Sequence, residues 1–232
     1  MSKKLYEESD VQAIADAIRA KNGSTDKYTV AEMAQAVTDI PSGGGGDIDG
    51  FVDGTVTSIK SDATKVAQYA CYKFASLTSV SLPNATSIGT SAFNSCNALT
   101  SAYIPNATTI NMYAFQKCSE LTSISIPNAT SILNSAFQEC SKLSSADCGN
   151  TTSLAPAAFH GCSSLKALYL RNTRAVCTLS NVNALSGTPI ANGEGYIYVP
   201  NDLVKSYKSA TNWSQYADRI ITITAFIDGG SK

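Results

Sequence analysis

Hydrophobic and polar residues recur along residues 63–172 with a period of 22. Five blocks of this length follow one another without a gap, and each ends in Asn. Within a block the eighth residue is always Ala and the fifteenth always Leu, and the ninth is Phe in four blocks. Because a block this short cannot bury its own apolar side chains, the repeat predicts units that stack and share one core.

Two spacings within each block predict its local structure. The apolar fourth, eighth and twelfth positions are four apart, which predicts a short helical turn. The apolar eighteenth and twentieth positions alternate with polar residues, as in Val80-Ser81-Leu82, which predicts a strand. Pro or Asn then supplies a turn. Stacked blocks of this kind predict a solenoid with a parallel β-sheet on one side and short helical turns on the other.

The order of residues within a block resembles a known repeat family. Ile, then Ala-Phe, then Cys, then Leu-Thr-Ser-Ile-x-Ile-Pro is similar to the BspA-type leucine-rich repeats, and the resemblance covers 110 of 232 residues in constant phase. It implies a leucine-rich-repeat solenoid. A fold does not name its ligand, so the resemblance leaves the binding partner open.

The segments on either side of the repeats predict further parts. Residues 1–41 carry two apolar stripes, each preceded by a capping signal, and predict an N-terminal helical hairpin. The glycine-rich residues 42–50 predict a flexible linker, and residues 51–62 predict strands that lead into the solenoid. Residues 173–232 predict a C-terminal α/β cap, in which a strand at 196–199 precedes a short helix and a final strand.

Both flanks resemble segments of phage proteins. Residues 8–37, ESDVQAIADAIRAKNGSTDKYTVAEMAQAV, are similar to the N-terminal hairpin of minor structural and tail proteins of bacteriophages and prophages. Residues 195–220 resemble the C-terminal module that accompanies BspA-type repeats in such proteins. The resemblance implies a tail protein of the virion, made in the bacterial cytoplasm. Its hairpin would bind other tail proteins or sister copies, and its solenoid a host surface protein or glycan.

Composition and charge exclude several classes of protein. The chain has 17 Lys+Arg, 18 Asp+Glu and one His, for a net charge of −1, which argues against a nucleic-acid surface. No apolar run reaches the length of about 18 residues that predicts a spanning helix, and the N-terminus does not resemble a secretory signal. Thirty Ser and 22 Thr outnumber the charged residues. Stacked like charges repel, so hydroxyls suit a layered structure.

The sequence offers no catalytic constellation. His160 stands at the tenth repeat position, where other blocks carry polar residues, so an exposed polar role is the simpler interpretation. The acids of blocks two to five, Glu120, Glu139 and Asp147, occupy three different repeat positions and predict no carboxylate pair. We therefore expect a non-enzymatic protein with no catalytic residues and no cofactor.

Four cysteines, Cys96, Cys118, Cys140 and Cys162, recur once per block at the twelfth position. Neighbouring layers are close enough for disulfides, but the spacing is that of core residues, and this favours buried thiols. A zinc site is less favoured, because a linear stack does not converge into a tetrahedron. In the first block Cys71 and Phe74 exchange the aromatic and thiol positions, which predicts that both remain inside.

The remaining candidate site is a surface on the sheet side of the solenoid. Most outward positions hold Ser or Thr, and five residues depart from this pattern. We predict that they form a contact patch toward the C-terminal half, because Tyr and Arg are typical interface residues; the alternative is that they are ordinary solvated side chains. The five are Tyr103, Asp147, Lys166, Tyr169 and Arg171.

Together these features predict a non-enzymatic tail-associated protein that presents a leucine-rich-repeat surface for recognition. A bacterial cell-surface adhesin of the BspA type is the alternative, and it would require a secretion signal or wall anchor. A cell-wall-acting enzyme is a third class, which would need a convergent pair of acids or a His pair.

Overall fold

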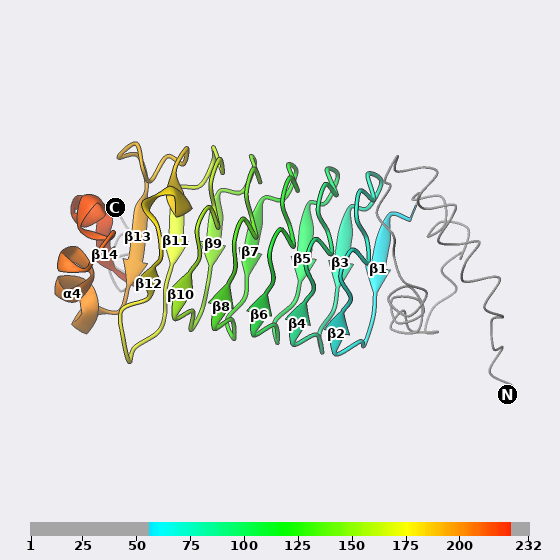
Figure 1. Cartoon of the computed structure of the whole chain (residues 1–232), viewed down its shortest axis with the longest axis horizontal. Helices are drawn as coiled ribbons and strands as arrows, with labels where there is room; N and C mark the ends of the chain where they lie inside the picture. Colours follow the sequence, from blue (N-terminus) through cyan, green and yellow to red (C-terminus); the bar gives the residue numbers. More distant parts are fainter. Residues whose placement is uncertain (1–55, 224–232) are drawn as a thin grey trace, which may run out of the picture.

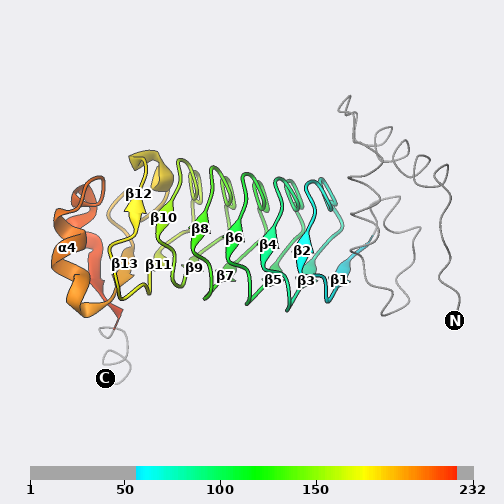
Figure 2. The same cartoon turned by 60° about the horizontal axis from the view of Figure 1, so that its bottom comes forward.

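The computed structural model describes residues 56–223, which form a stack of layers with the first described residues at one end and the last at the other (Figure 1). Residues 1–55 and 224–232 lie outside the described residues. The predicted hairpin and linker, the first five residues of the predicted entry strands and the last part of the predicted cap fall there. Within the described part, successive repeats lie side by side along the long axis, and the helix α4 lies at the C-terminal end (Figures 1 and 2).

Each layer contributes one strand to each of two parallel arrays. The first, here called the narrow sheet, is a continuous sheet of two-residue strands in the order β12-β10-β8-β6-β4-β2. Its strands are β2 (Lys65–Val66), β4 (Ser87–Ile88), β6 (Thr109–Ile110), β8 (Ser131–Ile132), β10 (Ser153–Leu154) and β12 (Thr178–Leu179). Partners in neighbouring regular repeats are one repeat length apart, as in Ser87 and Thr109, so the repeat length sets the register.

The second array carries the predicted strands at positions 17–19, and its solvent side is here called the broad face. It divides into the sheets β1-β3-β5 and β14-β13-β11-β9-β7. Its strands are β1 (Ser58–Lys60), β3 (Ser79–Ser81), β5 (Ser101–Tyr103), β7 (Ser123–Ser125), β9 (Ser145–Asp147), β11 (Ala167–Tyr169), β13 (Tyr196–Val199) and β14 (Ile220–Thr222). The sequence predicts the solenoid and these strands, and both are confirmed.

The prediction of short helical turns is wrong. The fourth position lies in a strand of the narrow sheet, and positions 7–11 form successive turns rather than a helix. The seventh and eleventh residues have positive φ, for example 59° at Tyr113 and 61° at Lys117, and left-handed residues interrupt a right-handed helix. Their N–H groups instead donate to the next layer, as from Tyr113 to Asn134 O at 3.0 Å.

The core consists of columns of identical side chains. Phe93, Phe115, Phe137 and Phe159 stack with ring centroids 5.2–5.3 Å apart. The cysteine column lies beside them, and each of its thiols donates to a carbonyl of the preceding layer, as from Cys118 Sγ to Phe93 O at 3.1 Å. All seven cysteines are free and buried, so the prediction of buried thiols is confirmed. Cys71 and Phe74 are both buried, which confirms their exchange.

Much of the hydroxyl and amide content binds backbone between layers. Threonines at the second position donate to the preceding layer, as from Thr108 Oγ1 to Thr86 O at 3.0 Å. Threonines at the sixteenth position do the same, as from Thr100 Oγ1 to Thr78 O at 2.9 Å. The terminal Asn of the repeat forms a parallel ladder, with Asn106 Nδ2 donating to Pro83 O at 2.8 Å. These side chains therefore stabilise the stack by donating to the preceding layer.

The last described residues pack on the end of the repeats. The strand β13 pairs with β11, and β14 pairs with β13. Between them lie the 3-10 helix η2 (Asn201–Leu203), the helix α4 (Val204–Ser209) and the 3-10 helix η3 (Ser214–Arg219); the 3-10 helix η1 (Val182–Leu185) precedes them. Trp213 is fully buried, and its Nε1 donates to Cys177 O at 2.6 Å. The strand predicted at residues 196–199 is therefore present as β13.

Candidate functional site

The broad face has two parts of different chemistry. The serine part is the outward surface of β1, β3, β5 and β7, where Ser occupies most outward positions. The tyrosine part is the outward surface of β9, β11, β13 and β14, where Tyr, Asp and Arg replace the serines. Both parts belong to one array of strands, and they differ in the side chains that face outward.

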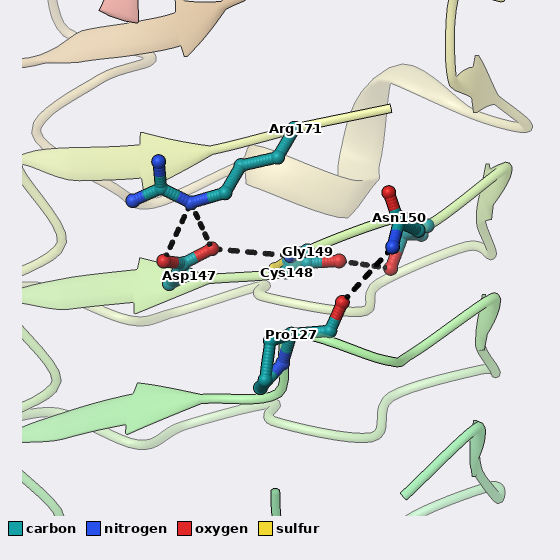
Figure 3. Close-up of polar contacts among 7 residues, drawn as sticks. Pro127, Asp147, Cys148, Gly149, Asn150 and Arg171 are labelled. Carbon is teal, nitrogen blue, oxygen red and sulfur yellow. Dashed lines mark hydrogen bonds and ion pairs between the residues drawn. The ribbon is translucent and has the colours of Figure 1, made fainter. Parts of the chain in front are cut away.

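A carboxylate turn opens the tyrosine part. Asp147 ends β9, and its Oδ1 accepts the N–H of Gly149 at 3.1 Å. Gly149 has φ +49°, and a Cβ there would lie 2.1 Å from the carbonyl oxygen of Pro127, so only glycine fits. Arg171, one layer further on, donates from Nε to both carboxylate oxygens of Asp147, at 3.0 and 2.8 Å (Figure 3). The two terminal nitrogens of Arg171 lie outside this ion pair (Figure 3).

Aromatic rings continue from this ion pair toward the C-terminal end. The guanidinium carbon of Arg171 lies 5.4 Å from the ring centroid of Tyr169, a cation–π distance. Tyr169 stacks on Tyr198 with centroids 4.5 Å apart and an interplanar angle of 13°. Tyr196 lies 6.4 Å from Tyr198, and Arg219 lies over the Tyr196 ring. Burial, together with the neighbouring Tyr169 and Tyr196, raises the pKa of Tyr198.

The structure brings together three of the five predicted patch residues. Asp147, Tyr169 and Arg171 lie in contact on neighbouring layers. Lys166 is exposed and immediately precedes β11. Its carbonyl accepts the N–H of Tyr196 at 2.8 Å, and its ammonium forms no ion pair within residues 56–223. Tyr103 belongs to β5 in the other sheet and contacts none of them through a described interaction.

Sequence reasoning missed the residues that complete the cluster. Tyr196, Tyr198 and Arg219 follow the last regular block, and Ala167 pairs with Tyr196 across a stretch longer than one repeat, so the period no longer indicates which residues align. The motif Tyr196-Ile197-Tyr198 did carry a signal. Its alternation has the phase of positions 17–19, which places both tyrosines on the outward side.

The described His and Cys side chains bear on metal binding and on nucleophilic chemistry. Among residues 56–223, no group of three His, Cys, Asp or Glu side chains is arranged to hold a metal ion. His160 is partly buried, and its Nδ1 has no hydrogen-bond partner among the described atoms. Burial raises the pKa of Cys96 to about 12, so this thiol is protonated and not nucleophilic near neutral pH. None of the described helices has the length and apolar character of a membrane span.

Comparison with known proteins follows the repeat. The chain matches the family of BspA-type leucine-rich repeat regions over residues 55–185, more than half of its length, with six copies of the repeat. The family match thus extends beyond the five regular blocks in both directions. No curated protein sequence is significantly similar to the chain.

Solved structures of leucine-rich repeat proteins are similar in fold. The pneumococcal vaccine antigen PcpA matches with a TM-score of 0.55 and 19% identity, over 73% of this chain and 40% of that protein. A leucine-rich cell surface protein of Faecalibacterium prausnitzii matches at 0.43 and 25%, over 72% of this chain and 43% of that one. An internalin of Listeria monocytogenes matches at 0.45 and 14%, over 91% and 56%. The chain therefore spans less than half the length of the first two.

Proposed function

Because this chain belongs to the BspA-type leucine-rich repeat family, we propose that it is a non-enzymatic recognition protein whose broad face binds a macromolecular partner. Repeat solenoids offer an extended surface of constant geometry, and ligand choice is set by the side chains that depart from the repeat. On the broad face, most of the side chains that depart from the repeat lie in the tyrosine part. The contact patch is formed by Asp147, Tyr169 and Arg171, with Lys166 beside them and Tyr103 at a separate position on the same face.

The single observation that supports this proposal is that the residues which depart from the repeat interact with one another. Asp147 replaces a serine, and Gly149 and Arg171 replace the proline of earlier blocks, yet the three form one connected motif. Gly149 permits the turn that orients the carboxylate, and the carboxylate fixes the Nε edge of Arg171. The terminal guanidinium nitrogens are thereby held at the surface. A positioned Arg beside tyrosines is typical of binding hot spots.

Binding of the labelled full chain to candidate host bacteria tests the proposal. The double variant Tyr169→Ser with Arg171→Gln should reduce saturable binding about tenfold or more, the effect of losing one or two hot-spot side chains. The matched control is Glu120→Gln with Lys142→Gln, which removes another exposed interlayer ion pair at 2.6 Å outside the patch. Equal binding by both double variants would dispose of the patch.

The biological setting belongs to the same proposal. The resemblance of residues 8–37 and 195–220 to phage tail proteins supports a tail-associated protein that attaches through its N-terminal segment to other tail proteins or sister copies. Detection of the chain by mass spectrometry in purified particles would support it. Its absence from particles together with its presence on intact bacterial cells would favour the cell-surface adhesin instead.

A further inference from the structure

The broad face is interrupted at one place, between β5 and β7. These strands are neighbours in the stack but are not paired in the sheet. The bond from Thr122 N to Thr100 O is 3.5 Å long, whereas the equivalent bonds one layer to either side are 2.8 and 2.9 Å. The narrow sheet is continuous through the same layers. The layers therefore separate on the broad face alone.

A groove of about 410 Å³ crosses this interruption, a volume within the range of small-ligand sites. It is lined by outward residues of β1, β3, β5 and β7, by the prolines that follow β5 and β7, and by the inward residues Ile59, Val80 and Ala102. Apolar atoms form the larger part of its surface, serines supply most of its polar groups, Lys60 is its one cation, and it contains no carboxylate. The serine part thus contains a concave, nearly neutral site that shares only Tyr103 with the predicted contact patch.

The serine hydroxyls of the groove differ from the threonine hydroxyls that precede them in the chain. Ser79, Ser101 and Ser123 form no side-chain hydrogen bond with any residue in the described range, although threonines at neighbouring positions donate to backbone. A serine hydroxyl has one donor and two acceptor sites. The groove therefore presents a row of unused donors and acceptors at the spacing of the layers.

Tyr103 supplies an aromatic surface beside these hydroxyls. It is 59% exposed, the most exposed large apolar side chain of the described residues. In contrast with Tyr169, whose ring is covered by Arg171 and Tyr198, Tyr103 contacts no ring or cation within residues 56–223. An uncovered ring face is negatively charged and attracts the polarised C–H groups of a ligand.

We propose that this groove binds a saccharide chain, with Tyr103 stacking on the C–H face of a sugar ring and the serines contacting its hydroxyl groups. A saccharide combines an apolar C–H face with hydroxyls that both donate and accept, which matches the lining. The near-neutral lining disfavours a strongly charged peptide. This inference rests on the recognition role proposed above and names a ligand class for a part of the face that the role leaves open.

An array of immobilised oligosaccharides, built from hexoses, N-acetylhexosamines and their acidic derivatives, tests the inference with the full chain. We expect saturable binding to at least one saccharide. Tyr103→Ala should weaken it about tenfold, and the double variant Ser101→Ala with Ser123→Ala about threefold to tenfold. Tyr113→Ala is the matched control. Tyr113 is exposed on the turn side, and Ala157 adopts the same left-handed conformation at this repeat position.

Three outcomes would overturn the inference: no saccharide binds, binding survives Tyr103→Ala, or a panel of unstructured peptides binds in a Tyr103-dependent manner instead. Binding of labelled chain to bacteria, measured in parallel, separates the two proposals. If cell binding depends on Arg171 while saccharide binding ignores Tyr103, the saccharide inference fails and the recognition role stands. If Tyr103 carries saccharide binding and no bacterium binds the chain, the recognition of host cells fails.

Discussion

The two parts of the broad face show how one repeat can be used in opposite ways. In the serine part the backbone ladder is interrupted and the outward hydroxyls are unengaged. In the tyrosine part the ladder runs unbroken from β9 to β14, and the side chains bind one another through an ion pair, stacked rings and cation–π contacts. The first part offers unused polar groups and a recess. The second offers a rigid, pre-organised surface.

This difference separates two routes to recognition. A pre-organised surface loses little side-chain entropy on binding, which favours hot spots with fixed geometry. A recess of small hydroxyl side chains also has little entropy to lose, but its contacts are individually weak and rely on shape. The variants below test whether the two parts are as different as the structure indicates, starting with the largest expected effect.

Gly149→Ala should damage the tyrosine part most. Its Cβ would meet the backbone of Pro127, and its φ is +49°, so we expect a loss of about 2–4 kcal/mol in the free energy of unfolding. Gly161→Ala is the control, because its φ is +73° but its Cβ would lie 3.4 Å from the Glu139 side chain and 3.8 Å from the Glu139 backbone, which are contacts without a steric clash. The control should cost about 1 kcal/mol. Urea denaturation measures both, and equal losses would contradict the structure.

Alkaline pH should weaken the core beneath the tyrosine part. Burial raises the pKa of Cys177 from 9.0 to about 12, and burial raises that of Cys148 as well, with Cys177 and Asp147 adding to it. Between pH 9.0 and 12 the folded chain keeps protons that the unfolded chain loses. The contribution of these thiols to the free energy of unfolding is therefore fully present below pH 9.0. It is lost as pH rises above 9.0, by up to about 1.4 kcal/mol per pH unit for each thiol.

The variant Cys148→Val isolates this contribution. Leu82 and Ile104 stand at the same repeat position, so a branched apolar residue fits there. Urea denaturation at several values between about pH 8 and 11 should give a shallower decline for the variant than for the unchanged chain. The other ionisable side chains are present in both chains, so the comparison reports on the Cys148 thiol. Identical pH dependence would show that Cys148 is not held protonated.

The ion pair of the tyrosine part should contribute modestly to stability. Its two side chains are 44% and 22% exposed, and partly exposed pairs are worth about 0.5–1 kcal/mol. A double-mutant cycle with Asp147→Asn and Arg171→Gln measures this coupling by denaturation. The Glu120–Lys142 pair, at 42% and 58% exposure, should give a smaller coupling. A coupling near zero for Asp147 and Arg171 would mean that the carboxylate does not fix the guanidinium.

The period of the repeat predicted the stack, the broad-face strands and the buried cysteine column, because each depends on spacing alone. The short helices were predicted wrongly for the same reason. Apolar residues four apart also fit successive turns. Lys117 and Glu139 have a left-handed backbone conformation, which the sequence does not reveal because Lys and Glu usually adopt right-handed or extended backbone conformations. The narrow sheet was missed because two-residue strands are too short for alternation.

The candidate site could be predicted only in part. Departures from the repeat pointed to Asp147, Tyr169 and Arg171, which the structure brings into contact. Contacts with the last layers were missed, since Tyr198 follows an irregular segment in which the repeat spacing is lost. The groove beside Tyr103 lies where two layers separate, and the residues of β5 and β7 do not predict this separation. The alternation of residues within a strand identifies the outward side chains, whereas a groove depends on the distance between neighbouring layers.

The smallest expected effect is that of Ser101→Ala, and its comparison with the neighbouring Thr100→Val tests the central contrast directly. Thr100 Oγ1 donates to Thr78 O at 2.9 Å, so Thr100→Val should cost about 0.5–1.5 kcal/mol. Ser101 lies next to it on β5, and its hydroxyl has no partner among residues 56–223, so Ser101→Ala should change stability by less than about 0.5 kcal/mol. Urea denaturation compares them. Equal losses would mean that the groove hydroxyls already serve the stack, and a hydroxyl that serves the stack is not free for a saccharide.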